Sequence, residues 1–240
     1  MKKVKLLSLG ILAAGVVYAV LPTYYHKLIN PQNLRRLTNS PSETKKKIAL
    51  TFDDGPDPRY TGRILDLLEE LQIKATFFIV GEKAERHPEL VERMIKEGHH
   101  IAFHSYEHAN GMLKSPGYTK RDFQECRKLS QKYGWDIHLF RPPWGHTNLW
   151  SNYYARQNGF HLVYWNVMAQ DWSKNATPVT IASKLMKRVK PGAVICLHDS
   201  GGAPGAPEHT ISALKQALPW LLNQGYEFTG LEDDPIWKLL

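Results

Sequence analysis

The chain has 240 residues, of which 42% are hydrophobic and 22% are charged. This composition excludes an intrinsically disordered protein and provides enough apolar residues for one domain with a sizeable core. The formal net charge is +8, but basic residues cluster at residues 2–5 and 45–47, so we expect no nucleic-acid partner.

Residues 1–25 predict a signal peptide or an N-terminal membrane anchor. Lysines at the start precede an uncharged, mostly aliphatic stretch over residues 6–25, which is the pattern of a targeting segment. The stretch is close to the roughly 20 residues that a bilayer span needs, and residues 17–19 offer a small-residue cleavage site. Because the positive charges precede it, we expect the rest of the chain outside the cytoplasm, anchored to the membrane or secreted after cleavage.

Residues 26–46 are polar and predict a linker, after which residues 47–240 form one domain. Short apolar runs alternate there with longer amphipathic ones. The predicted strands cover residues 48–52, 75–80, 100–103, 161–166, 193–197 and 226–229. The predicted helices cover residues 61–71, 88–97, 119–133, 148–158, 178–189 and 209–223. Repeated strand–helix units indicate an α/β fold with a parallel sheet, either open or closed into a barrel.

Polar motifs follow the predicted strands along the whole domain. They are TFDDGP at residues 51–56, HSYEH at 104–108, RPPWG at 141–145, QDW at 170–172 and LHDS at 197–200. In α/β barrels the carboxyl ends of the strands form one face, and the active site lies there. We therefore expect the five motifs to meet at one rim.

Two adjacent carboxylates and two nearby histidines are the strongest candidates for a metal site. Asp53 and Asp54 repel each other unless a cation compensates them, and His104 and His108 are spaced to share one face of a helix or turn. Two histidines and one carboxylate suit a divalent metal with open positions, either zinc in a hydrolase or ferrous iron. Histidines at this spacing are also common on protein surfaces, and the upstream acid pair favours the metal.

The aspartate that does not bind the metal would be available as a general base that takes a proton from an activated water. Arg141 could hold that base through a charge-assisted bond, or could be a surface arginine before a proline turn. Pro142 and Pro143 stiffen the next loop and would leave the Trp144 N–H to bind an oxyanion. The Trp144 ring could stack on a sugar or pack in the core.

His198 could act as a general acid, or could be a structural histidine. Asp171 and Asp199 are candidates to orient the acid–base residues, and each could equally be a helix cap or a turn residue. Cys126 and Cys196 lie in different predicted elements without a metal-binding spacing, which predicts buried reduced thiols rather than a disulfide.

Together these motifs resemble those of the polysaccharide deacetylase family, carbohydrate esterase family four, over residues 46–230. The resemblance implies that residues 47–240 form a catalytic domain with a distorted (β/α)-type barrel, usually of seven strands. It also implies removal of acetyl groups from N-acetylated or O-acetylated sugars with one divalent metal ion, often Zn²⁺.

The resemblance also implies roles for individual residues. Asp54, His104 and His108 resemble the metal ligands of the family, and Asp53 resembles its catalytic base. Arg141 resembles the residue that tunes this base.

The remaining roles come from the later motifs. Trp144, with Pro143 beside it, resembles the oxyanion and substrate-binding residues, and His198 resembles the general acid. The fourth motif of the family usually begins with an aspartate that orients this histidine, whereas this chain has Met168. Asp171 of the same motif is present, and we expect weaker activity or that another acid substitutes.

We expect a metal-dependent hydrolase that removes N-acetyl groups from a polysaccharide containing N-acetylglucosamine. Peptidoglycan is the favoured substrate, since an anchored enzyme would lie beside a cell wall. Three alternatives stay open: a deacetylase of O-acetylated xylan or chitooligosaccharides, a non-catalytic glycan-binding module on the same fold, and a small-molecule amidase. A deep closed pocket would favour the amidase, and an open groove would favour a polymer.

Overall fold

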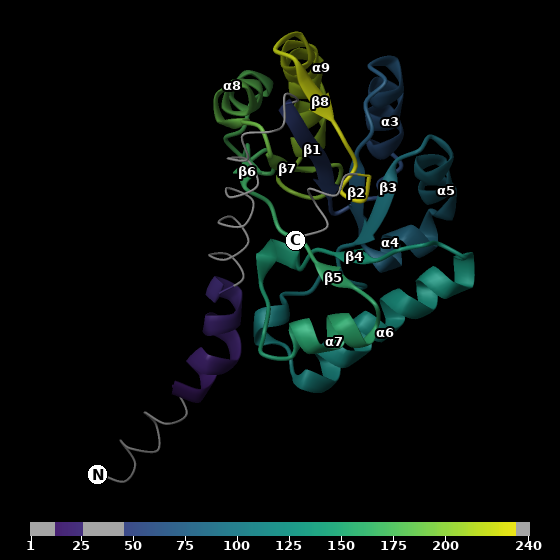
Figure 1. Cartoon of the computed structure of the whole chain (residues 1–240), viewed down its shortest axis with the longest axis vertical. Helices are drawn as coiled ribbons and strands as arrows, with labels where there is room; N and C mark the ends of the chain where they lie inside the picture. Colours follow the sequence, from purple (N-terminus) through teal and green to yellow (C-terminus); the bar gives the residue numbers. More distant parts are fainter. Residues whose placement is uncertain (1–12, 26–45, 234–240) are drawn as a thin grey trace.

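A computed structural model describes residues 13–25 and 46–233 (Figure 1). The predicted linker over residues 26–46 lies outside the described residues except for Lys46. In the described part of the domain, parallel strands form one curled sheet, and Figure 1 shows the helices arranged around its outer side. The predicted α/β fold with a (β/α)7-type sheet is confirmed.

The sheet has a continuous path of seven strands in the order β5-β4-β3-β2-β1-β7-β6, and an eighth strand, β8, pairs with β1. The strands are β1(Lys46–Asp53), β2(Thr76–Ile79), β3(His100–Phe103), β4(Leu139–Phe140), β5(His161–Leu162), β6(Val167–Met168), β7(Val194–His198) and β8(Tyr226–Phe228). The two ends of the path, β5 and β6, are consecutive in the chain and do not pair among the described residues. The barrel is therefore open at this position.

The predicted helices are present, with shifted ends. The helices are α3(Thr61–Glu70), α4(Gly81–Arg86), α5(Pro88–Lys96), α6(Pro116–Tyr133), α7(Ser151–Gln157), α8(Pro178–Arg188) and α9(Ala206–Asn223), with the short 3₁₀ turns η2(Gly111–Leu113) and η3(Pro143–Gly145). Helix α6 begins earlier than predicted because Ser115 caps it by accepting a hydrogen bond from the Tyr118 N–H. Sequence reasoning missed α4, which is too short to show a helical period.

The predicted strand over residues 161–166 is two short strands, β5 and β6. The Val163 N–H donates to the Phe140 carbonyl, whereas the Asn166 N–H donates to the Val194 carbonyl. The chain therefore changes partners between the two edges of the open barrel, and a single strand cannot run through this stretch.

The register of the central strand positions the candidate site. Asp53 at the end of β1 pairs with His198 at the end of β7. On the other side of β1, the chain continues from β3 into His104 and from β4 into Arg141, whose N–H donates to the Phe103 carbonyl over 2.8 Å. The polar residues that follow these strands therefore meet at one rim of the sheet.

Residues 13–25 are helical, with a π-helical segment, η1(Val16–Val20), in the middle. Pro22 has no N–H to give the Tyr18 carbonyl, and that carbonyl accepts the Leu149 N–H instead, over 2.8 Å. Thr23 is buried; its hydroxyl donates to the Thr147 carbonyl and accepts from the Thr147 N–H. These bonds attach the helix to the loop after RPPWG.

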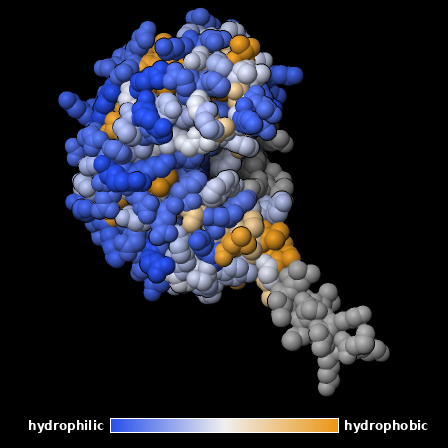
Figure 2. Space-filling view, turned by 180° about the vertical axis from the view of Figure 1, so that it is seen from behind, coloured by the Kyte–Doolittle hydropathy of each residue, from blue (hydrophilic) through white to orange (hydrophobic). Residues whose placement is uncertain are grey.

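The first half of the predicted targeting segment lies outside the described residues, and its role stays a prediction. Within the described residues, no helix is both long and apolar enough to cross a membrane. The helix nevertheless exposes apolar side chains to solvent, with exposed fractions of 39–61% at Val16, Val17, Leu21, Tyr24 and Tyr25. Figure 2 shows hydrophobic surface gathered at the lower right of the molecule.

The core between the sheet and the helices contains stacked aromatic rings, and one of them offers a test of the packing. The rings of Phe52 and Phe77 lie 5.1 Å apart between centroids, and both side chains are buried. We expect Phe77→Ala to lower the free energy of unfolding by about 3–5 kcal/mol, because it leaves a cavity under β1. Urea denaturation measures this change.

Val179→Ala is the control for the core substitution. Val179 lies on α8 with 68% of its surface exposed, so we expect its replacement to change stability by no more than about 0.5 kcal/mol. Equal effects of the two substitutions would contradict the packing described for the sheet.

Candidate active site

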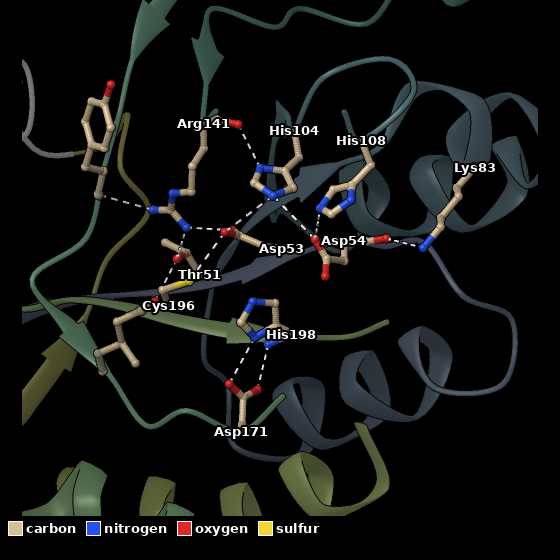
Figure 3. A network of polar contacts seen from close by, with 12 residues as sticks. Thr51, Asp53, Asp54, Lys83, His104, His108, Arg141, Asp171, Cys196 and His198 are labelled. Carbon is tan, nitrogen blue, oxygen red and sulfur yellow. Dashed lines mark hydrogen bonds and ion pairs between the residues drawn. The ribbon is translucent and has the colours of Figure 1, made fainter. Parts of the chain in front are cut away.

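Asp54, His104 and His108 converge on one point at the rim of the sheet (Figure 3). Nε2 of His108 lies 2.8 Å from Oδ1 of Asp54, and Nε2 of His104 lies 3.4 Å from the same oxygen. One donor atom from each residue lies within 4.8 Å of the others. One carboxylate oxygen and two imidazole nitrogens at this spacing fit a divalent cation with further positions open.

The backbone around these three side chains is strained. Asp54 and His108 have φ angles of 77° and 54°, and Ser105 between the histidines has 65°. Such left-handed conformations are uncommon for residues with a side chain and cluster at functional sites. Gly201 also approaches closely, since a Cβ atom there would lie 2.9 Å from Oδ2 of Asp54. The fold therefore holds the carboxylate in a fixed place.

Neighbouring groups set the chemical state of the three donors. Nδ1 of His104 contacts the Arg141 carbonyl at 2.7 Å, and donation to this carbonyl leaves Nε2 with the lone pair that a metal needs. Burial alone would raise the pKa of Asp54, but its contacts with His104 and His108 lower the pKa well below the ordinary value. Asp54 is thus ionised and ready to bind a cation.

Asp53 lies next to this group and is held by Arg141. Nη1 of Arg141 donates to Oδ1 of Asp53 over 2.6 Å and to the Thr51 hydroxyl over 2.7 Å. The guanidinium is fully buried, and its central carbon lies 3.8 Å from the centre of the Phe78 ring. The alternative prediction that Arg141 lies on the surface is therefore wrong. The other Asp53 oxygen, Oδ2, faces Cys196 at 3.4 Å.

His198 at the end of β7 is oriented by Asp171. Asp171 is fully buried; its Oδ1 lies 3.0 Å from Nδ1 of His198, and its Oδ2 accepts the backbone N–H of His198 over 2.8 Å. Burial alone would lower the pKa of His198, but the charge and hydrogen bond of Asp171, helped by Asp54 and Asp53, raise it to about 9. His198 is thus a protonated imidazole beside the Asp53–Asp54 pair.

The other candidate orienting residues do not reach His198 in this way. Met168 lies on the cavity wall. It occupies the position at which the family that the motifs resemble usually has an aspartate. Asp199 accepts a hydrogen bond from the Thr61 hydroxyl over 2.6 Å and packs against Gly55, where a side chain would collide with it. Burial raises the pKa of Asp199 to about 7. Its place is under the TFDDGP turn, and Asp171 takes the orienting position.

A cavity of about 620 Å³ opens over these groups. Its wall includes Trp144, Trp165 and Trp172. Trp144 has a left-handed backbone (φ 55°), and its ring lies 4.7 Å from that of His108. Pro143 is buried and lines a small neighbouring pocket rather than this cavity.

Sequence reasoning missed the roles of three residues at this site, two that line the cavity and one that supports Arg141. Lys83 from the unpredicted helix α4 donates to the Asp54 carbonyl over 2.7 Å and to the Ser200 hydroxyl over 2.8 Å. Cys196 was expected only to be a buried reduced thiol, and both cysteines are indeed free and buried, but Cys196 also borders the cavity. Thr51 has no predicted role, and its hydroxyl accepts a hydrogen bond from Arg141. For Cys196 and Thr51, alternation along a strand was the available signal, since each lies two positions before a cavity residue.

Comparison with known sequences decides the family. The sequence profile of the polysaccharide deacetylase family matches residues 40–163, which is more than half of the chain. This chain belongs to the polysaccharide deacetylase family. The membership predicted from the five motifs is thereby confirmed.

Individual members of the family show the same similarity over most of the domain. The chain is 36% identical to a peptidoglycan-N-acetylglucosamine deacetylase of Bacillus cereus, over 79% of this chain and 88% of the relative. It is 31% identical to a chitooligosaccharide deacetylase of Rhizobium leguminosarum bv. trifolii, over 78% of this chain and 90% of the relative.

A solved structure extends the comparison to three dimensions. The crystal structure of the Bc1960 peptidoglycan N-acetylglucosamine deacetylase superposes with a TM-score of 0.73 at 33% identity, covering 78% of this chain and 87% of that one. This polysaccharide deacetylase family member therefore shares the fold of that deacetylase.

The contact between His198 and Asp171 leads to a test in solution. If His198 acts as the general acid, it must be protonated, and activity should fall as pH rises through the pKa of His198, at about 9. Asp171→Asn removes the charge that raises this pKa. We expect the alkaline limb of the kcat/KM profile to move to lower pH by about 1–3 units.

Asp199→Asn is the matched control for this pH profile. Its carboxyl group contacts Thr61 instead of the His198 ring, so we expect the alkaline limb to stay near its original pH. An unchanged alkaline limb in Asp171→Asn would show that His198 is not the titrating acid.

Proposed function

We propose that this chain is a metal-dependent hydrolase that removes N-acetyl groups from a polysaccharide containing N-acetylglucosamine, with peptidoglycan as the substrate. One observation carries the proposal: Asp54 converges with His104 and His108, while Asp53 beside them is held by Arg141 on one oxygen only. A cation ligand and a separate base next to each other are what hydrolysis of an amide requires. The activities named for the B. cereus relative and for Bc1960 support the choice of substrate.

A divalent cation bound by Asp54, His104 and His108 would supply a Lewis acid and lower the pKa of a nearby water. We propose Zn²⁺, because two imidazoles and one carboxylate with open positions suit catalytic zinc.

The residues of the chain supply the other steps. Asp53 takes a proton from the attacking water, and its ion pair with Arg141 keeps it oriented towards the reacting carbonyl. The backbone N–H of Trp144 stabilises the oxyanion that forms on the acetyl oxygen. His198 then donates its proton to the sugar nitrogen as the C–N bond breaks, which yields acetate and a free amine.

The aromatic residues around the cavity favour a sugar polymer over a small amide. Trp144 and Trp172 are 52% and 44% exposed, so their rings stand open to solvent at the cavity edge. Aromatic faces of this kind stack on sugar rings. A small-molecule amidase would instead be expected to enclose its substrate.

The localisation proposal follows from the N-terminal segment. We propose that it targets the domain to the outer side of the membrane, where it either anchors the enzyme beside the cell wall or is removed. The uncharged run in the sequence and the exposed apolar side chains of Val16, Val17 and Leu21 support this.

Release of acetate tests the reaction. The wild-type chain should release acetate from N-acetylated peptidoglycan fragments, and Asp53→Asn should reduce kcat by about 10²–10⁴-fold because the general base is lost. Chelation should abolish the activity, and Zn²⁺ should restore it. Asp66→Asn on the exposed face of α3 is the control, and its activity should be unchanged.

Parallel assays with chitooligosaccharides and acetylated xylan rank the alternative substrates. If no acetylated glycan yields acetate while glycan binding persists, the chain is a binding module and the proposed reaction is wrong.

Cell fractionation tests the localisation. We expect the expressed full chain in the membrane fraction, accessible to protease added outside the cells, or a shortened chain in the medium if the leader is cleaved. Recovery in the cytosol, protected from protease, would contradict the proposal. A cytosolic protein expressed in the same cells is the control for lysis.

A further inference from the structure

A second group of three metal-binding side chains lies beside the one formed by Asp54, His104 and His108. It consists of Asp53, Cys196 and His198, with one donor atom from each within 4.8 Å of the others. Among the described residues, only these two groups bring three such donors together. The second group differs in one chemical respect, because it contains a sulfur.

The sulfur has no role in the proposed reaction, yet it lies at the reacting groups. Cys196 is on β7, in register with Thr51, and its Sγ is 3.4 Å from Oδ2 of Asp53. It contributes to the wall of the cavity, as do Asp53 and His198. The other cysteine, Cys126, is buried in α6, away from this cavity.

The other two members are already oriented as ligands. Arg141 occupies Oδ1 of Asp53, which leaves Oδ2 on the side of the sulfur. Asp171 binds Nδ1 of His198, so the second ring nitrogen faces away from that carboxylate (Figure 3). A carboxylate behind a histidine is the usual support for a histidine that binds a metal.

We propose that Asp53, Cys196 and His198 form a second metal site that selects thiophilic ions, such as Zn²⁺ in excess or Cd²⁺, over Mg²⁺. A soft thiolate ligand provides this selection. On binding, the S–H bond of Cys196 and the Nε2–H bond of the protonated His198 break, both protons pass to solvent, and a metal–sulfur and a metal–nitrogen bond form. Because the site uses both the base and the acid of the proposed reaction, its occupation inhibits deacetylation. Only this inhibitory consequence rests on the proposed function.

The two sites adjoin but have separate donors. Nε2 of His104 in the first group lies 3.9 Å from Oδ2 of Asp53 in the second. Both acids of the TFDDGP motif face this region, and Arg141 is the positive partner of only one of them.

Binding of Cd²⁺ to the full chain tests the site directly. Equilibrium dialysis with elemental analysis should find two Cd²⁺ per wild-type chain, with a thiolate-to-metal charge-transfer absorption in the ultraviolet. The chain has two cysteines, so their replacement assigns the absorption. Cys196→Val should bind one Cd²⁺ and lose the absorption, whereas Cys126→Val should retain both.

His104→Ala separates the two sites, since it should weaken the first and keep the charge-transfer absorption of the second. Equal Cd²⁺ stoichiometry and equal absorption in wild type and Cys196→Val would overturn the proposal. If Cys196→Val does not fold, as judged by circular dichroism, Cys196→Ser provides the same comparison with a smaller change in shape.

Inhibition by excess Zn²⁺ is the second measurement. In Cys196→Val, normalised to its own activity, the Zn²⁺ concentration for half-inhibition should rise by about 100-fold, since the loss of even a supporting partner costs about 10–100-fold in affinity. The same inhibition in both proteins would overturn the inhibitory role. A chain without deacetylase activity would contradict the proposed function, while the charge-transfer measurement would still decide whether the site exists.

Discussion

The buried residue Arg141 connects two parts of the site, Asp53 and the proposed metal ligand His104. Arg141 donates to Asp53 on one side, and its carbonyl contacts Nδ1 of His104 on the other. Its side chain also bonds to the Thr51 hydroxyl and the Tyr164 carbonyl. One residue thus fixes both the proposed base and the ring orientation of a proposed metal ligand.

This arrangement is costly unless every partner is in place. A buried ion pair loses its hydration, and the attraction within the pair offsets that loss only when the remaining donors are also bonded. Here β1 and the segment after β5 provide partners for Nη1 and Nη2, whereas Nε of Arg141 is buried with no hydrogen-bond partner among the described residues. Asp53 ends β1, whereas His104 and Arg141 follow β3 and β4, so the arginine side chain reaches past β2 to the acid along the rim of the curled sheet.

Two further residues of the site are also held in place by a hydrogen-bonding partner that lies behind them. Asp171 holds His198 by the ring and by its backbone N–H, and Lys83 holds the Asp54 turn through a backbone carbonyl. The supporting residues lie behind the rim, whereas the atoms that they orient face the cavity. The left-handed backbone at Asp54 and His108 is maintained by this surrounding packing.

The sequence alone determined the fold class, the motifs and the family, because alternation of strands and helices places the ends of parallel strands at one rim. It also indicated the acid pair and the two histidines, since few other settings favour that combination. Only the tertiary structure decided that Arg141 is buried against Asp53, that Asp171 takes the orienting position, and that Cys196 borders the cavity. The contacts of Asp53 with Arg141 and Cys196 join residues more than 80 positions apart, and the contact of Asp171 with His198 joins residues 27 positions apart. They depend on register and side-chain direction in the sheet, which no local pattern records.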